Sequence, residues 1–539
     1  MKKLAYLSLV GLLLLAACQQ KTAQLPADYK QLDRPAVTFP DYADVVIPPN
    51  IAPLNFMVTD SALQQVVVHY QTEGAELAVG GGADGKVRID TTQWRSLLQA
   101  ARGHDVAVSI YACLADSGWV RYPDQRLSVA EEEIDSFLSY RLIEPGYELY
   151  RQLGLYQRNL TNFSQHPIYE NNRKYDDSHN HCINCHNYRN YRTEDMLFHV
   201  RASHGGTIII HGDEARKVQI KDSTIITAGV YPSWHPTQRL VAFSTNKTGQ
   251  TFHIYHQEKV EVLDEASDLL LYDADRNEVT HILRSRDQLE TFPCWSPDGR
   301  KLFYCNADLT HTVDLSVPDS ILPMHVIAKN DSLYYDLWSL DFDPETRTFG
   351  QPKLEVNVSR THHSLSVPRV SPDGRYVLYT LGRYGQFHIW HMSSDLWVKD
   401  LQRDTCYALS AANSIGAPDS YHSWSSNGRW IAFASRRLDK NYSRAFIAYF
   451  DREGQAHKAF LLPQEDPEHN TLLLKSYNVP ELTRDAVHIS PEKLRKCIYE
   501  TEGEKATYKA PSPALPRGEE VNGISGHSPL ALPRAGRKS

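Results

Sequence analysis

The chain is poor in methionine, shows no excess of basic residues, and lacks apolar runs long enough for a multi-span membrane protein. Its 539 residues include five methionines but 30 tyrosines and 29 prolines, a balance that favours strands and turns. Lys and Arg number 57 against 65 Asp and Glu, which disfavours nucleic acid as a partner. With 41% hydrophobic residues and a mean hydropathy of −0.46, the composition predicts a soluble, β-rich protein of about two to four domains.

The first segment has the pattern of an export signal. Two lysines precede an apolar stretch from Leu4 to Leu15, which is too short to span about 30 Å of hydrocarbon. Cys18 follows two alanines, and this arrangement resembles a bacterial lipoprotein signal. The resemblance implies removal of residues 1–17, acylation of Cys18 and a membrane anchor, with Gln19 directing the protein to the outer membrane, facing the periplasm. Plain secretion is the alternative.

The strongest chemical signal is the C-x-x-C-H pattern at Cys182-Ile183-Asn184-Cys185-His186. Two thiols at this spacing can reach both vinyl groups of one porphyrin edge, with the next histidine beneath the iron. The pattern predicts one covalent haem c, attached by Cys182 and Cys185, with His186 as the proximal iron ligand. A zinc half-site would need a second Cys or His pair, and a redox dithiol would need a βαβ context.

The distal iron ligand is left open by the sequence. Thr193 is a plausible N-cap of a short helix on which Met196 and His199 share one face. Met196 is the first candidate, because a thioether ligand raises the haem potential, whereas a core-filling role is the alternative. His199, another nearby histidine or an open site are further alternatives.

The other cysteines do not form a complete disulfide framework, because five remain after Cys18 and the C-x-x-C pair are set aside. Cys294 and Cys305 flank a predicted hairpin turn. We expect them to be packing residues of a strand pair rather than a disulfide.

Two amphipathic segments precede the C-x-x-C-H pattern. Ser128 and Glu131 match a capping box, and apolar residues follow at helical spacing as far as Leu142. A second helical pattern runs from Leu149 to Phe163. We therefore expect a short α-helical haem module over residues 128–204.

Four later segments repeat one pattern, in which an aromatic or valine residue precedes a turn and a strand rich in β-branched and aromatic residues. The turn is Pro-Asp-Gly in two copies, a sequence whose three residues each favour a tight turn. The four reference positions are Trp234, Trp295, Val370 and Trp424. Repetition at this scale predicts a propeller or a solenoid.

These repeats resemble the TolB-like (WD40-like) propeller repeat. The resemblance implies a C-terminal β-propeller of about six blades over residues 205–500. Short apolar strands predict a β-sandwich over residues 40–127, after a linker at 18–39. Residues 501–539 carry a basic, aperiodic sequence, which predicts a disordered tail.

Three functional classes follow. The main prediction is a mainly β, envelope-tethered c-type haem lipoprotein that transfers electrons or senses redox state, with periplasmic redox or scaffold proteins as partners. The second is an enzyme that uses an open haem site or a metal in the propeller channel, where His362, His363 and His422 are candidate ligands; some TolB-like propellers are metal-dependent lyases. The third is a haem-free propeller scaffold that binds envelope proteins or peptidoglycan, as the TolB-like resemblance implies.

Overall fold

The computed structural model describes residues 23–144, 150–174, 180–256 and 258–510. The chain forms two compact units: residues up to Glu133 together with Pro463–Leu472, and Ile134–Leu462 together with the chain from Leu473 onward. The predictions for residues 1–17, for Cys18 and for the tail beyond residue 510 lie outside the described residues. Among the described residues, no helix is long and apolar enough to cross a bilayer.

The first unit contains two β-sheets. Its seven-stranded sheet is built from β1 (Lys30–Gln31), β9 (Gly118–Arg121), β8 (Asp105–Leu114), β10 (Gln125–Val129) and β3 (Val45–Ile47), with β5 (Leu63–Thr72) and β6 (Ala75–Gly81) joined through β8. The three-stranded sheet is built from β2 (Thr38–Phe39), β4 (Phe56–Val58) and β7 (Lys86–Val87). The apolar strands predicted for residues 40–127 are therefore present, and strands also occupy part of the predicted linker.

Helix α2 (Thr91–Ala100) of this unit was not predicted. Asp90 caps it, because its Oδ1 accepts hydrogen bonds from the backbone N–H groups of Thr92 and Gln93. The helix buries Trp94, whose ring meets that of Tyr70 edge-on at 5.7 Å. Its apolar positions are few, so the hydrophobic pattern of this segment is weak.

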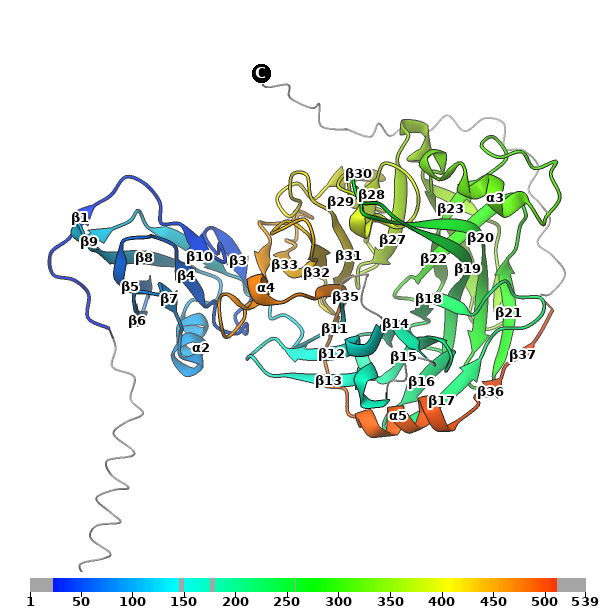
Figure 1. Ribbon diagram of the computed structural model, residues 1–539, viewed down its shortest axis with the longest axis horizontal. Helices are drawn as coiled ribbons and strands as arrows, with labels where there is room; N and C mark the ends of the chain where they lie inside the picture. The colour runs from blue at the N-terminus through cyan, green and yellow to red at the C-terminus, as the bar shows by residue number, and fades with distance from the viewer. Residues whose placement is uncertain (1–22, 145–149, 175–179, 257, 511–539) are drawn as a thin grey trace, which may run out of the picture. The chain divides into compact units, whose positions relative to one another are not determined.

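The second unit is a β-propeller of six sheets, which we number as blades 1 to 6 along the chain (Figure 1). Blade 1 contains β35 (Ser476–Thr483), β11 (Phe137–Ile143), β12 (Gly154–Asn159) and β13 (Gln165–Glu170). Blade 2 contains β14 (His181–Arg189), β15 (Arg192–Ala202), β16 (Gly206–His211) and β17 (Glu214–Gln219). Blade 3 contains β18 (Gly229–Trp234), β19 (Leu240–Phe252), β20 (Val260–Asp273) and β21 (Glu278–Leu283).

The other three blades come from the chain between residues 288 and 461. Blade 4 contains β22 (Gln288–Trp295), β23 (Lys301–Asp308), β24 (Asp336–Asp343), β25 (Thr348–Phe349) and β26 (Lys353–Val356), and helix α3 (Leu322–Ile327) lies between β23 and β24. Blade 5 contains β27 (Ser364–Val370), β28 (Tyr376–Gly382), β29 (Asp395–Asp400) and β30 (Thr405–Ala408). Blade 6 contains β31 (Asp419–Trp424), β32 (Trp430–Ser435), β33 (Arg444–Tyr449) and β34 (Phe460–Leu461).

The propeller ring is closed by strands from both ends of the unit. The late strand β35 pairs antiparallel with the early strand β11, as in Leu138 opposite Leu482. The predicted number of about six blades agrees with this topology. The predicted start at residue 205 is wrong, because three strands of blade 1 and two strands of blade 2 lie before it.

The predicted helices between residues 128 and 163 are also wrong. Ser128 belongs to strand β10 and donates a hydrogen bond to Asp105 rather than capping a helix. Strand β11 is buried over most of its length, and such strands carry a nearly continuous apolar run that resembles a helix face in sequence. Residues 128–204 thus supply strands to both units and do not form a helical module.

The predicted hairpin turns are confirmed. In blade 4, the Ser296 hydroxyl bonds to Asp298 at 2.6 Å, and Asp298 accepts the backbone N–H of Arg300 at 3.0 Å. Gly299 follows with a φ of +69°, and a Cβ there would lie 2.4 Å from the His235 ring of blade 3. The turn therefore needs glycine both for its backbone and for the close approach of the neighbouring blade.

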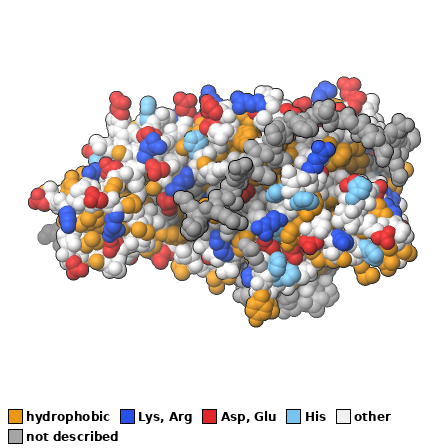
Figure 2. Space-filling view, turned by 90° about the horizontal axis from the view of Figure 1, so that it is seen from above, with side chains coloured by type: hydrophobic (Ala, Val, Ile, Leu, Met, Phe, Trp, Pro, Cys, Tyr) orange, Lys and Arg blue, Asp and Glu red, His pale blue; other side chains and the backbone are white. Residues whose placement is uncertain are grey.

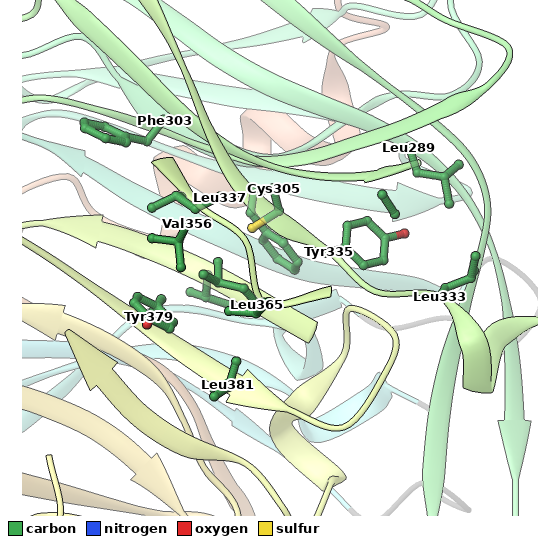
Figure 3. Close-up of a cluster of buried hydrophobic side chains, with 14 of the residues drawn as sticks. Leu289, Phe303, Cys305, Leu333, Tyr335, Leu337, Val356, Leu365, Tyr379 and Leu381 are labelled. Atoms are coloured by element: carbon green, nitrogen blue, oxygen red, sulfur yellow. The ribbon is translucent and has the colours of Figure 1, made fainter. Parts of the chain in front are cut away.

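Apolar side chains fill the spaces between blades. Figure 3 shows part of the cluster between blades 4 and 5, in which Cys305 lies among residues such as Leu337 and Leu365. Cys294 belongs to the same cluster, and both cysteines are free thiols. Their predicted role as packing residues of a strand pair agrees with this placement. Figure 2 shows acidic and basic side chains interspersed over one face of the described residues.

The prediction of a disordered tail from residue 501 is wrong for its first residues, because two short strands form there. Helix α5 (Pro491–Glu500) is followed by β36 (Glu504–Lys505) and β37 (Thr507–Tyr508), which extend blades 2 and 3 as parallel outer strands. The Lys217 ammonium donates to the carbonyls of Ile498 and Thr501 at the helix C-terminus. The sequence of this segment has no periodicity, and its two strands form by pairing with the outer strands of blades 2 and 3.

Candidate functional site: an axial funnel

The strand nearest the propeller axis is the first one named above for each blade, and we call it the innermost strand. In all six blades the innermost strand contains one residue with a positive φ at the same position. Register shifts occur at these positions, as expected for β-bulges that re-aim a side chain. We call these residues the plug: Cys185, Tyr231, Phe292, Val367, Tyr421 and Val479.

The plug side chains meet on the propeller axis. The rings of Tyr231 and Phe292 lie 4.2 Å apart, although they come from different blades. Phe292, Val367 and Tyr421 are buried in one cluster, against which Tyr231 and Val479 pack. Burial raises the pKa of both Tyr231 and Tyr421, and the nearby Cys185 thiol raises both further. Cys185 is therefore close to tyrosines of two opposite blades, 3 and 6. The plug thus closes the axis with mostly apolar groups.

Two positions after the plug, each blade contributes one polar side chain. We call this second ring the belt, and it consists of Asn187, Ser233, Cys294, Arg369, Ser423 and Glu481. All six line a funnel that is open to solvent and lies on the side of the Pro-Asp-Gly turns.

The belt joins successive blades by hydrogen bonds to the backbone. Asn187 accepts from the N–H of Trp234 at 3.1 Å, and Ser233 accepts from that of Trp295 at 3.2 Å. The same contact links Ser423 to Leu482 at 3.3 Å, and Glu481 to Tyr188 at 3.2 Å. The backbone of Val370 bonds to the Cys294 thiol. Five of the six belt side chains therefore act as acceptors.

Glu481 is the acidic member of the belt. It accepts hydrogen bonds from the Asn187 amide at 3.0 Å and from the Tyr188 backbone, and its side chain is 16% exposed. Burial raises its pKa to about 7, although the positive charge of Arg369 opposes that rise. Glu481 therefore changes charge close to neutral pH.

Tyr191 lies at the rim of the funnel. It occupies the tight turn between β14 and β15, where both Asn190 and Tyr191 have positive φ values of 50° and 61°. Burial raises the pKa of its hydroxyl, and the charges of Asp135, Cys294 and Glu481 raise it further, so the hydroxyl lies close to these groups. This is the one turn of the described funnel rim that presents an aromatic side chain toward the belt.

The residues of the C-x-x-C-H pattern lie in the innermost strand of blade 2. Cys182 is 6% exposed and packs in the cluster that contains Leu155, Ile210 and Ile498. Cys185 belongs to the plug and lies outside that cluster, although burial and then the nearby Cys182 raise the pKa of its thiol.

His186 is also buried, and burial lowers its pKa to about 3. Its Nε2 lies 3.9 Å from the Glu481 carboxylate. A porphyrin bonded to both thiols would occupy space that the plug and the cluster around Cys182 already fill. The residues present therefore do not fit a covalent haem.

The candidate distal ligands lie in strand β15, where no helix forms. Met196 is fully buried in the apolar cluster with Cys182, as a core-filling methionine would be. His199 is 3% exposed and its Nδ1 lies 3.4 Å from the Thr207 hydroxyl. At a separation of three residues, their side chains belong to opposite faces of the strand.

The three histidines considered as channel ligands are not brought together. His362 is exposed, His363 contacts Thr361, and His422 bonds through Nε2 to the Leu378 carbonyl at 3.2 Å. Within the described ranges, no group of three or more His, Cys, Asp or Glu side chains could hold a metal ion.

The end of the axis opposite the funnel is covered by strands β19 and β20. They extend beyond the other strands of blade 3 and run toward β27 and β28 (Figure 1). Glu261 of β20 accepts a hydrogen bond from Tyr384 of blade 5 at 2.7 Å, and Asp264 accepts one from Tyr335 of blade 4 at 3.0 Å. The funnel is therefore the open end of the axis.

The class of the protein, a six-bladed β-propeller with an open axial funnel, follows from the pairing of its own strands. No family profile and no curated protein sequence matches the chain. It is similar to the crystal structure of TolB from Acinetobacter baumannii, with 12% identity over 73% of this chain and 85% of that chain and a TM-score of 0.39.

Two further solved structures show the same kind of similarity. For the propeller domain of the Trilobed protease from Pyrococcus furiosus, identity is 9%, coverage is 67% of this chain and 95% of that chain, and the TM-score is 0.32. For an oligogalacturonate lyase in complex with manganese, identity is 14%, coverage is 79% and 99%, and the TM-score is 0.27.

Proposed function

We propose that this chain is a partner-binding propeller scaffold of the cell envelope, whose funnel receives a segment of a partner polypeptide. The belt is the observation that carries the proposal, because it lines one concave site with hydroxyl, amide, thiol, guanidinium and carboxylate groups. An extended peptide offers N–H and C=O groups that such a mixed lining can satisfy. The envelope location depends on the export signal predicted for residues 1–17 and on acylation of Cys18.

The plug supports a binding role in which the ligand enters and leaves through the open end of the funnel. Because its apolar side chains close the axis below the belt, a bound segment would end there rather than thread through. The rigid hairpin turns around the funnel favour a preformed site, which lowers the entropic cost of binding.

The test is a selection of peptides from a random display library on the chain without residues 1–17. We expect selected peptides to bind the wild type and to lose affinity at least tenfold for Ser233→Trp, which fills the funnel. Thr237→Trp is the matched control, because Thr237 is exposed on the adjacent turn and does not line the funnel. Thermal unfolding of each variant shows whether the propeller is intact.

A second measurement needs no variant. Hydrogen exchange of the wild type should slow on peptide binding in the segments 187–191, 233–236 and 294–297, which line the funnel. Peptides that bind Ser233→Trp as well as the wild type, or that protect only segments outside the funnel, would refute the proposed function.

A further inference from the structure

Arg369 differs from the other belt residues in one chemical respect. The other five side chains accept a hydrogen bond from the backbone of the next blade. A guanidinium group has five N–H donors and no acceptor, so Arg369 cannot make this contact. Its place in the belt therefore does not serve the inter-blade hydrogen bond that the equivalent residues provide.

The guanidinium of Arg369 lies close to the propeller axis. Burial raises the pKa of Cys294 in blade 4 and of Glu481 in blade 1, and the positive charge of Arg369 opposes that rise. Burial lowers the pKa of His422 in blade 6, and the charge of Arg369 lowers it further. Burial also lowers the pKa of His186 in blade 2, and the same charge lowers it further. Only a charge near the centre of the ring is close to groups in four other blades.

Few of the Arg369 donors are used by the protein. Nη1 donates to the carbonyl of the preceding Pro368 at 3.0 Å, and the side chain also bonds to the Cys294 thiol. In the part of the chain that the structure describes, no carboxylate lies within 4.0 Å of it. Arg369 lines the funnel and is only partly buried, so a ligand in the funnel can reach it.

We propose that Arg369 binds a carboxylate of the ligand in the funnel. This inference depends on the proposed function and names the chemical group that the site recognises. A planar carboxylate matches the guanidinium fork with two parallel hydrogen bonds, and partial burial strengthens them relative to bulk water. Glu481, on the same funnel wall, accepts an N–H donor of the same ligand.

The carboxylate can come from a peptide C-terminus or from an acidic side chain. We expect selected peptides to contain Asp, Glu or a free C-terminus at the positions that bind. For each peptide, one synthetic analogue carries a C-terminal amide and another carries Gln or Asn in place of the acid. Loss on amidation identifies the terminus as the source, and loss on the second change identifies the side chain.

The protein variants test the residue itself. Arg369→Gln should weaken peptide binding at least tenfold by titration calorimetry, and Arg369→Lys should be intermediate because it keeps charge but loses the bidentate geometry. Arg360→Gln is the control, since Arg360 is an exposed arginine of the segment that precedes β27 in blade 5 and does not line the funnel. Unchanged thermal unfolding of the variants shows that the fold is retained.

The outcomes separate the two proposals. If selected peptides bind in the funnel but tolerate Arg369→Gln, or bind equally well without any carboxylate, the carboxylate site is refuted while the scaffold proposal stands. If no peptide depends on the funnel, the scaffold proposal itself fails.

Discussion

Blades 2 and 6 place similar residues on the same backbone positions of their innermost strands. Blade 2 has Cys185-His186-Asn187-Tyr188, and blade 6 has Tyr421-His422-Ser423-Trp424. Cys185 and Tyr421 share the positive φ of the plug, and both histidines are buried with pKa values lowered to about 3 by burial. The histidine of the C-x-x-C-H pattern therefore has a counterpart in a blade that lacks the cysteines.

The comparison shows that residues of a propeller repeat can match the C-x-x-C-H pattern without binding haem. The two blades differ at the first cysteine, Cys182, which corresponds to no thiol in blade 6 and packs in the core between blades 1 and 2. The plug and belt roles explain Cys185 and Asn187 without a haem, and the buried His186 has His422 as its counterpart.

The largest expected effect concerns haem itself. When the chain is exported together with haem-maturation proteins and extracted with acid–acetone, we expect no c-type band near ~550 nm in the reduced-minus-oxidised spectrum. A retained band would show that blade 2 opens in a way that blade 6 cannot, and it would restore the electron-transfer prediction.

The second prediction compares truncations in the plug. Tyr421→Ala should destabilise the propeller by about 3–5 kcal/mol, because it removes a large buried ring at the axis. Cys185→Ala should cost about 1 kcal/mol, since it removes one sulfur at the equivalent position. Denaturant unfolding followed by fluorescence gives both values, with Tyr255→Ala at an exposed loop as a reference within about 0.5 kcal/mol of wild type. Equal losses at the two positions would show that the size of the buried plug side chain does not set the loss of stability.

The third prediction concerns acid stability. His186 and His422 remain neutral in the folded protein down to a pKa of about 3, whereas the unfolded chain protonates them near their ordinary value of 6.5. The unfolded state therefore binds more protons between these values, and stability falls as pH drops below 6.5. We expect each histidine to cost about 2 kcal/mol between pH 6.5 and pH 5.

The matched variants are His186→Gln and His422→Gln, each compared with His362→Gln at an exposed position. The two buried variants should show a smaller loss of thermal stability on acidification than the wild type. If only one of them does so, the two blades differ at this position.

The smallest expected effect is on ligand affinity. Because the pKa of Glu481 is raised to about 7, its carboxylate is mostly protonated at pH 6 and ionised at pH 8. A ligand N–H donor bound to it loses a charge-assisted bond worth about 1 kcal/mol, so selected peptides should bind about fivefold more weakly at pH 6. Glu481→Gln should remove this dependence while keeping the acceptor for Tyr188. An unchanged pH profile in that variant would exclude Glu481 as the titrating group.

Much of the propeller could be predicted from local sequence. The hairpin turns and the strands that follow them act through contacts within a few residues, and their repetition indicates blades 3 to 6, although only blades 4 and 5 have the Pro-Asp-Gly sequence. The strands of blades 1 and 2 before residue 205 were missed because no copy of the repeat lies there. Strand β11, buried over most of its length, also has no alternating pattern to separate it from a helix.

The candidate site was not predictable in the same way. The alignment of Trp234, Trp295, Val370 and Trp424 already contained four belt residues, each one position earlier: Ser233, Cys294, Arg369 and Ser423. Recognising them required the two blades without a copy of the repeat and the bulge that re-aims each side chain. The special role of Arg369 appears only when all six belt positions are compared.

The sequence by itself determined the polar or apolar character of each position. It also determined the hairpins and the repeat, because these depend on short-range conformational preference. Tertiary structure alone decided that β35 closes blade 1 with β11, that two short strands after α5 extend blades 2 and 3, and that Cys185 belongs to the plug and lies outside the cluster around Cys182. The physical reason is that strand pairing and axial packing join residues more than 300 positions apart, such as Leu138 and Leu482, whose proximity no local pattern encodes.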